Sequence, residues 1–266
     1  MNKRPANITP KKEKPVYLPC FYAYFIVNIV IDQGNTSAKV AFFHEYKLLS
    51  SFIFKLLTVD KLRKLQSKFS PSHGILCSVT EVDPEITEFL KSSLPGFYVF
   101  DQTLKLPVQV DYKTPQTLGK DRVSAIVGAW NNHKDKNILV IDLGTAITYD
   151  FLDASGVYQG GNISPGMTIR FKALNEYTKR LPLIDEQGDL PKFGYDTETA
   201  IRSGVVGGIV KEIDAYIDEY KKQYPDLLVF LTGGHSFYFE TKLKNSTFAD
   251  GNLVLTGLNE ILNYQK

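Results

Sequence analysis

Two stretches of the chain, IVNIVIDQGNT at residues 26–36 and NILVIDLGTA at residues 137–146, repeat one pattern. Each is an apolar run rich in β-branched residues that ends in an aspartate, Asp32 or Asp142, with a glycine two positions later. Such runs predict buried strands. A glycine in the following turn lets backbone N–H groups approach phosphate oxygens, and the carboxylate can hold a metal ion or its water ligands. The repeat therefore predicts two related halves that face each other across a nucleotide.

The rest of the chain alternates strand-like and helix-like segments, which indicates an α/β fold. In the first half we expect strands at 26–31, 37–43, 50–56, 74–80 and 97–101, and helices near 59–68, 83–91 and 121–132. In the second half we expect strands at 137–142, 146–152, 157–163 and 227–232, and helices near 167–178, 197–221 and 256–264. The order of three strands followed by helices in both halves predicts a duplicated domain with a boundary near residues 133–137.

Length and composition are those of an ordinary globular protein, with 266 residues, 43% of them hydrophobic and 23% charged. The formal net charge of +2 is due to a basic segment within the first 14 residues, and the remainder is near neutral. This balance argues against nucleic-acid binding. The two cysteines, Cys20 and Cys77, provide neither a disulfide framework nor a zinc-site spacing, which favours a reducing, cytoplasmic setting.

The N-terminal segment imitates a signal peptide, because a basic start precedes an apolar run at residues 16–31. The run is short for a membrane span, and no small-x-small cleavage site follows it. Its last part is also the strand that leads into Asp32, so cleavage after the run would destroy the first turn. We therefore expect residues 1–25 to be a loose extension, residues 26–31 to be a core strand, and the protein not to associate with membranes.

Further motifs occur in order along the chain. Residues 32–39 fit DxGNTxxK, residues 119–122 fit GxDR, residues 142–150 fit DxGTAxTxD, residues 160–166 fit GGxIxPG, and residues 197–204 fit TxxAIxSG. In these motifs the chain resembles the type III pantothenate kinases, which belong to one superfamily with acetate and sugar kinases, Hsp70 and actin. The resemblance covers residues 26–260, so the N-terminal extension lies outside it.

This resemblance implies an α/β fold of duplicated actin-like (ribonuclease H-like) ATPase domains, each a mixed five-stranded sheet with helices. After the extension at 1–25, the lobes would be residues 26–135 and 136–266. The implied activity is ATP-dependent phosphorylation of the 4′-hydroxyl of pantothenate, the first step of coenzyme A biosynthesis, by a cytoplasmic homodimer. ATP with Mg²⁺ and a monovalent cation, K⁺ or NH₄⁺, would be needed.

The first Asp-Gly turn is the expected ATP-phosphate site. The resemblance assigns to ATP Asp32, Gln33, Gly34, Asn35, Thr36, Ser37, Ala38 and Lys39, together with Thr145 of the second turn. Turn donors would bind phosphate oxygens, Asp32 would hold Mg²⁺ through water, and Lys39 would neutralise phosphate charge. The structural alternative is that Asp32 only caps a tight turn that needs glycine for its backbone angles.

Asp121 is the candidate general base, because an attacking primary alcohol must lose its proton and a carboxylate within reach can accept it. The alternative is that Asp121 only caps the helix that starts there. The neighbouring Arg122 is expected to bind the carboxylate of pantothenate or a phosphate. Its alternative is an ordinary arginine on a helix surface.

The other site assignments depend on the resemblance. It assigns Asp142 to the monovalent cation, although the sequence alone does not distinguish K⁺ from Mg²⁺ at a carboxylate. It assigns the acceptor substrate to Tyr112, Gly119, Lys120, Asp121, Arg122 and Thr197, in a pocket completed across the dimer. Without it, Tyr112 is a loop aromatic and Thr197 is a first-turn helix residue beside a capping Asp196.

Glycines mark the second half as well. Gly204, Gly207 and Gly208 fall in the long predicted helix, where each costs about 1 kcal/mol relative to alanine. We assign this helix face to the dimer interface. Gly233 and Gly234 fit the turn that lies beside adenosine in the superfamily.

Three other functions are alternatives to pantothenate phosphorylation: another small-molecule kinase of the superfamily, a non-catalytic transcriptional accessory protein, and an actin-like filament. The first would not predict Tyr112 together with the motif at 119–122. Intact Asp32, Lys39 and Asp121 count against the second, and the short chain counts against the third. The motifs of P-loop enzymes, zinc proteases and serine hydrolases are absent from the sequence.

Overall fold

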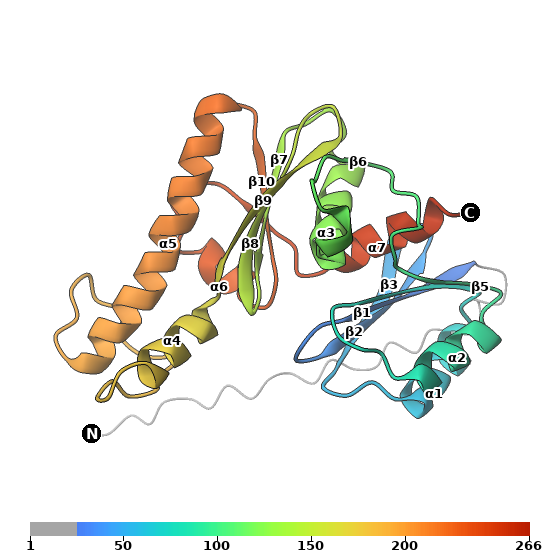
Figure 1. Cartoon of the computed structure of the whole chain (residues 1–266), viewed down its shortest axis with the longest axis horizontal. Helices are drawn as coiled ribbons and strands as arrows, with labels where there is room; N and C mark the ends of the chain where they lie inside the picture. The colour runs from blue at the N-terminus through green and yellow to red at the C-terminus, as the bar shows by residue number, and fades with distance from the viewer. Residues whose placement is uncertain (1–25) are drawn as a thin grey trace, which may run out of the picture.

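The computed structural model describes residues 26–266, and the extension expected at residues 1–25 lies outside them. The described chain forms two mixed sheets, with helices between them and on their outer faces (Figure 1). The predicted α/β class and the arrangement in two sheets are confirmed. Among the described residues, no helix combines the length and the hydrophobicity that crossing a bilayer requires.

The first sheet has the strand order β3-β2-β1-β4-β5. Its strands are β1 (Val27–Gln33), β2 (Ala38–His44), β3 (Lys47–Phe54), β4 (His73–Ser78) and β5 (Gly96–Val99). The first three strands form an antiparallel meander, β4 pairs in parallel with β1, and β5 pairs in parallel with β4. Helices α1 (Val59–Phe69) and α2 (Pro84–Ser93) cover the outer face (Figure 1), and their N-caps are Thr58 and Asp83.

The second sheet has the strand order β11-β10-β7-β8-β9-β6. Its strands are β6 (Gln109–Val110), β7 (Ile138–Leu143), β8 (Ala146–Leu152), β9 (Val157–Pro165), β10 (Leu228–Thr232) and β11 (Phe248–Ala249). It has six strands, whereas the sequence placed four and the resemblance implied five, because the two-residue strands β6 and β11 were not predicted and each adds an edge. Helices α4 (Met167–Glu176), α5 (Thr197–Gln223) and α6 (Ser236–Glu240) lie on its outer face (Figure 1).

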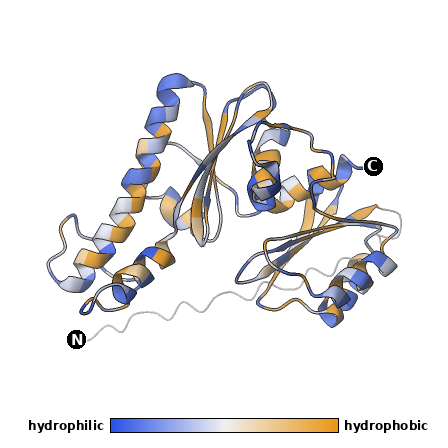
Figure 2. Ribbon diagram, in the orientation of Figure 1, coloured by the Kyte–Doolittle hydropathy of each residue, from blue (hydrophilic) through white to orange (hydrophobic). Residues whose placement is uncertain are grey.

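Hydropathy follows this layering. The strands are largely hydrophobic in Figure 2, whereas the C-terminal end of α5 is hydrophilic. The apolar residues of α5 that recur every four positions form one face, which is buried against the second sheet: Ile201, Val205, Ile209, Ile213 and Ile217. The motif-bearing strands β1 and β7 are each buried in the centre of a sheet.

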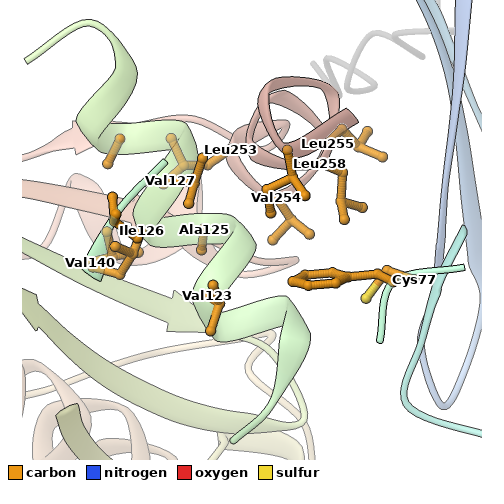
Figure 3. Close-up of a cluster of buried hydrophobic side chains, with 14 of the residues drawn as sticks. Cys77, Val123, Ala125, Ile126, Val127, Val140, Leu253, Val254, Leu255 and Leu258 are labelled. Carbon is orange, nitrogen blue, oxygen red and sulfur yellow. The ribbon is translucent and has the colours of Figure 1, made fainter. Parts of the chain in front are cut away.

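Two helices occupy the space between the sheets. They are α3 (Lys120–Asn131) and α7 (Leu253–Asn263), and their side chains form one apolar cluster that reaches Cys77 of β4 and Val140 of β7 (Figure 3). The helices cross at two glycines in near backbone contact. A Cβ on Gly257 would collide with the carbonyl of Ser124, and a Cβ on Gly128 would collide with the carbonyl of Leu253.

Each of the lobes proposed for residues 26–135 and 136–266 contributes one element to the other. β6 pairs in parallel with β9 of the second sheet, and α7 packs against β1 and β4 of the first. A buried amide network fixes α7 there, because Asn28 Nδ2 donates to Asn259 Oδ1 at 2.7 Å. Asn259 Nδ2 in turn donates to the carbonyl of Glu45 at 2.7 Å. The two lobes are thereby held together by strand pairing, helix packing and buried hydrogen bonds.

Candidate active site

The first Asp-Gly turn joins β1 to β2. Asp32 is the next-to-last residue of β1 and lies beside Lys39 of β2 and Cys77 of β4 in the strand register. The turn is closed by a hydrogen bond from Gly34 N to the carbonyl of Ser37 at 3.0 Å. This leaves the exposed residues Asn35 and Thr36 at its tip, available to a ligand.

The side chains of the remaining residues assigned to the ATP site point in different directions. The Gln33 amide donates to Thr80 Oγ1 at 3.2 Å, so that side chain is directed at the neighbouring loop. Ala38 is buried. Lys39 Nζ donates to the carbonyl of Gly251 at 3.3 Å, which brings its charge to the segment before α7. In this conformation Gln33 and Ala38 offer a ligand mainly backbone groups.

The second Asp-Gly turn joins β7 to β8 in the same way. Gly144 N donates to the carbonyl of Ala146 at 3.1 Å, and Thr145 is exposed at the tip. The turn at Gly233, which has φ of +88°, packs directly on Asp142. A Cβ at this position would collide with Asp142 Oδ1, so only glycine permits this approach. The two glycine-containing turns of the second half therefore form one surface.

Asp121 lies at the start of α3, between the two turns. Gly119 occupies the N-cap position and Asp121 falls within the first helical turn, so Asp121 is not the helix cap. Asp121 Oδ1 accepts from the backbone N of Arg122 at 2.9 Å. A Cβ on Gly119 would lie 2.6 Å from the same oxygen, so this glycine makes room for the carboxylate. Lys120, the next residue, is partly buried.

The three aspartates share one electrostatic environment. Burial raises the pKa of Asp32 to about 6, with the charge of Lys39 opposing and that of Asp121 adding to the rise. Burial raises the pKa of Asp142 to about 7, and the charges of Asp121, Asp32 and Asp150 add to this while Lys39 opposes it. The structure therefore brings together Asp32, Lys39, Asp121 and Asp142, which lie far apart in the sequence.

These shifts predict how the stability of the ligand-free protein depends on pH. Asp32 and Asp142 take up protons in the folded protein between pH 8 and pH 5, whereas in the unfolded chain they stay ionised down to their ordinary pKa of 3.8. The folded state binds more protons in this window, so these groups make the protein more stable at pH 6 than at pH 8.

Thermal unfolding without nucleotide or divalent metal, followed from pH 5.5 to 8.5, measures this dependence. We expect the dependence to shrink in the Asp142→Asn variant, which removes the group with the larger shift. An unchanged pH profile in that variant would contradict the assignment.

Arg122 is buried rather than on a helix surface, which excludes the alternative considered for it. Its Nε donates to Asp150 Oδ1 at 2.9 Å, and its Nη2 lies 2.6 Å from the same oxygen as an ion pair without hydrogen-bond alignment. Burial lowers the pKa of Arg122, but hydrogen bonding and the charge of Asp150 outweigh it and hold the pKa above its ordinary value. The sequence did not predict this ion pair, because Asp150 was noted only as the last position of the motif at residues 142–150.

Tyr112 lies beside this pair. Its ring centroid is 6.3 Å from that of Tyr158, and the ring packs over Gly160 of β9. Its hydroxyl also acts on Arg122, raising the pKa of that side chain after the larger effects of burial and Asp150. Tyr112 and Arg122 are thus brought together in the structure.

Thr197 belongs to a different part of the surface. It is the first residue of α5, next to the Asp196 N-cap, which forms a capping box with Thr199 as its partner. It lines a groove of about 870 Å³ between α4 and α5, whose walls include Leu174, Tyr177 and Leu181. The residues around Tyr112 and Arg122 do not line this groove.

The carboxylates of Asp32, Asp121 and Asp142 suit a cation that retains water or phosphate ligands in addition to protein oxygens. Carboxylate oxygens are the preferred ligands of Mg²⁺, which usually retains waters and binds substrate phosphates as well. In residues 26–266, no group of three or more His, Cys, Asp or Glu side chains is close enough to form a complete metal site by itself.

A cavity of about 310 Å³ adjoins Lys39, and sequence reasoning did not predict it. Its walls come from both halves of the chain, with Ile53 of β3 on one side and Phe237, Asp250 and Asn252 on the other. Phe237 follows the Gly233–Gly234 turn closely, so that turn is the sequence feature from which the cavity could have been expected.

Solved structures of other proteins share the fold. A glucokinase from an Antarctic psychrotroph superposes with a TM-score of 0.54 at 12% identity, covering 90% of this chain and 99% of that one. A conserved Baf family protein from Campylobacter jejuni superposes with a TM-score of 0.57 at 23% identity, covering 89% and 98%. At these identities the likeness concerns the fold alone. The fold is that of the actin-like ATPases and sugar kinases.

The sequence then defines the family. The pattern of the type III pantothenate kinases matches residues 28–219, and the chain belongs to that family. A type III pantothenate kinase of Azobacteroides pseudotrichonymphae is 50% identical over 238 residues, covering 90% of this chain and 97% of the relative. One from Phocaeicola vulgatus is 48% identical over 240 residues, covering 90% and 98%.

Proposed function

We propose that this protein transfers the γ-phosphoryl group of ATP to the 4′-hydroxyl of pantothenate, the first step of coenzyme A biosynthesis. One observation carries the proposal for this member of the family. Asp121 lies within electrostatic reach of both Asp32 and Asp142, so an acceptor-binding residue and two phosphate turns converge. Phosphoryl transfer depends mainly on such positioning and on charge neutralisation.

The two Asp-Gly turns bind the nucleotide in this mechanism. Exposed donors at the turn tips, Asn35, Thr36 and Thr145, meet phosphate oxygens, and Lys39 offsets the negative charge that develops on them. Asp32 would hold Mg²⁺, which supplies further charge neutralisation when bound, and Asp142 would hold the monovalent cation.

Asp121 acts on the acceptor. Its carboxylate orients the 4′-hydroxyl and accepts the proton that this oxygen loses as it bonds to the γ-phosphorus. The bond between the γ-phosphorus and the bridging oxygen breaks, and ADP leaves with the electron pair. The position of Asp121 in the first turn of α3 keeps the carboxylate fixed between the two lobes.

A coupled assay of ADP release tests the proposal. With ATP and Mg²⁺, we expect release that depends on pantothenate and is faster in K⁺ than in Na⁺ buffer, since a weakly hydrated cation suits a site built from one carboxylate and turn carbonyls. The Asp142→Asn variant should lose the difference between the two buffers. Release that is pantothenate-dependent but equal in both buffers would contradict the cation assignment while leaving the substrate assignment intact.

The absence of pantothenate-dependent release from a folded protein that binds ATP would contradict the proposed activity. Sugars would then be the next acceptors to test, since the fold is shared with sugar kinases. A protein that turns over no acceptor would favour the regulatory alternative. Membership of the pantothenate kinase family speaks against both outcomes.

We also propose a homodimer formed by the surface around α4 and α5. Tyr177 and Phe193 there are 83% and 78% exposed, and the groove beside them is mostly apolar. A Cβ built on Gly204 or Gly207 would meet no other atom within 4 Å, so this face of α5 is open to a close partner. A second copy of the chain would cover the patch and bring Thr197 to its partner's substrate site.

We place the reaction in the cytoplasm, where ATP is available. Two features support this proposal: the single described cysteine, Cys77, is buried as a free thiol, and the sequence has no cysteine spacing that indicates disulfides.

A further inference from the structure

Asp150 is a buried carboxylate to which the proposed mechanism gives no task. It lies on β8, is 1% exposed, and follows Thr148 by two residues on the same face of the strand. An ionised carboxylate in such a place is unfavourable unless it is paired and fully hydrogen-bonded. Asp150 meets that condition, and the partners that satisfy it indicate its role.

Hydrogen-bond donors surround both oxygens of Asp150. Oδ1 accepts from Arg122 Nε at 2.9 Å and from the Tyr158 hydroxyl at 2.7 Å, and it lies 2.6 Å from Arg122 Nη2. Oδ2 accepts from Thr148 Oγ1 at 2.8 Å. Thr148 and Tyr158 belong to neighbouring strands of one sheet, so the carboxylate has a fixed orientation.

This fixed carboxylate holds one edge of a guanidinium group. A guanidinium presents two pairs of parallel N–H bonds, one along Nε and Nη2 and one along Nη1 and Nη2. Asp150 occupies the first edge. The second edge of the guanidinium lies at the end of a side chain that is only 7% exposed, with the Tyr112 hydroxyl as its neighbour. Such an arrangement is suited to a second oxyanion.

The surroundings of Arg122 indicate which oxyanion this is. Arg122 bonds to Asp150, which also accepts from Tyr158. Tyr112, which the resemblance assigns to the acceptor, packs beside Tyr158 and over Gly160. We therefore place the acceptor, rather than the ATP phosphates, next to Arg122.

We propose that Asp150 is a positioning residue that orients Arg122 for the carboxylate of the acceptor, and so sets the preference for an anionic acceptor. The inference rests on the proposed function, because it concerns the same acceptor site. Tyr158 assists by holding the same oxygen of Asp150. Asp150 itself does not touch the acceptor.

Steady-state kinetics with two acceptors test this proposal. The acceptors are pantothenate and pantothenyl alcohol, in which a hydroxymethyl group replaces the carboxylate and the reacting hydroxyl is unchanged. In Asp150→Asn we expect KM for pantothenate to rise about tenfold or more, because a misaligned charged pair loses at least that much binding. kcat should change less, and kcat/KM for pantothenyl alcohol should stay within about threefold, since no carboxylate is involved.

Two more variants separate positioning from folding. Tyr158→Phe removes one hydrogen bond to Asp150 without changing charge or shape, and it should produce a smaller loss of the same preference for pantothenate. Asp153→Asn makes the same chemical change in the β8–β9 turn, where the carboxylate binds Ser155 and Gln159, and the preference should not change. Thermal unfolding of each variant measures any loss of fold.

The outcomes are distinct. A reduced preference for pantothenate in Asp150→Asn and Tyr158→Phe supports the proposal. Equal losses for both acceptors, or a preserved preference in Tyr158→Phe when Asp150→Asn does not fold, would overturn it and leave Asp150 a structural residue. A raised KM for ATP alone would also overturn it, because Arg122 would then serve a phosphate. If the unmodified protein phosphorylates neither acceptor, the proposed function fails before the variants are compared.

Discussion

The Asp121→Asn variant should bind ATP normally and lose phosphoryl transfer, with kcat lowered by about 10³-fold, in the range usual for a missing general base. The amide is the same size and can still accept from the backbone N of Arg122, as Oδ1 does now at 2.9 Å. It cannot take the proton from the attacking hydroxyl. The loss therefore falls on kcat rather than on the fold of α3.

Rapid-quench measurement of phosphoryl transfer, together with calorimetry of ATP binding, separates these two effects. Asp135→Asn is the matched control, because Asp135 is exposed beyond the end of α3 and has φ of +61°, which asparagine also tolerates. It should match the unmodified protein in both measurements. A kcat within tenfold of normal in Asp121→Asn would show that another group accepts the proton.

The Gly257→Ala variant should be the most destabilising single methyl addition in the described chain. Its Cβ would collide with the carbonyl of Ser124, so α3 and α7 would have to move apart through the shared core. We expect the free energy of unfolding to fall by about 3 kcal/mol, the upper part of the range for overpacked cores. For a chain of this length, that corresponds to a melting temperature lower by roughly 10 °C.

Thermal and urea unfolding measure this effect, with Thr256→Ala as the control on the preceding residue. Thr256 is only partly buried, and alanine favours helix, so its variant should stay within about 0.5 kcal/mol of the unmodified protein. Equal stability of the Gly257 and Thr256 variants would mean that the two helices are not held as tightly as their backbone contact indicates.

Local features of the fold were well predicted, because their causes are local. The β-branched runs before Asp32 and Asp142 form the central strands β1 and β7. Asp196 caps α5 as expected, since a short acceptor side chain before a helical pattern is a direct signal. The start of α7 was placed at residue 256 instead of Leu253, although Asn252 at the N-cap position is a residue type that marks helix starts; its side chain makes no capping hydrogen bond.

Pairings between distant segments were harder to predict. The strands β6 and β11 have two residues each, too few to show a periodic pattern, and they exist only through pairing with β9 and β10. Arg122 illustrates the same limit in the site. Its position was predicted from a motif, but its partner Asp150 is 28 residues away and approaches only when α3 packs on β8.

The placement of α7 also affects the order in which the protein can mature during synthesis. Every strand of the first sheet leaves the ribosome before α7 does, yet that sheet's inner face is completed by α7. Residues such as Val30 and Ile75 therefore remain without their final neighbours through the translation of the whole second sheet. The core under α1 and α2 uses only residues of the first lobe, whereas the core between the two sheets is complete only once α7 has been made, late in translation.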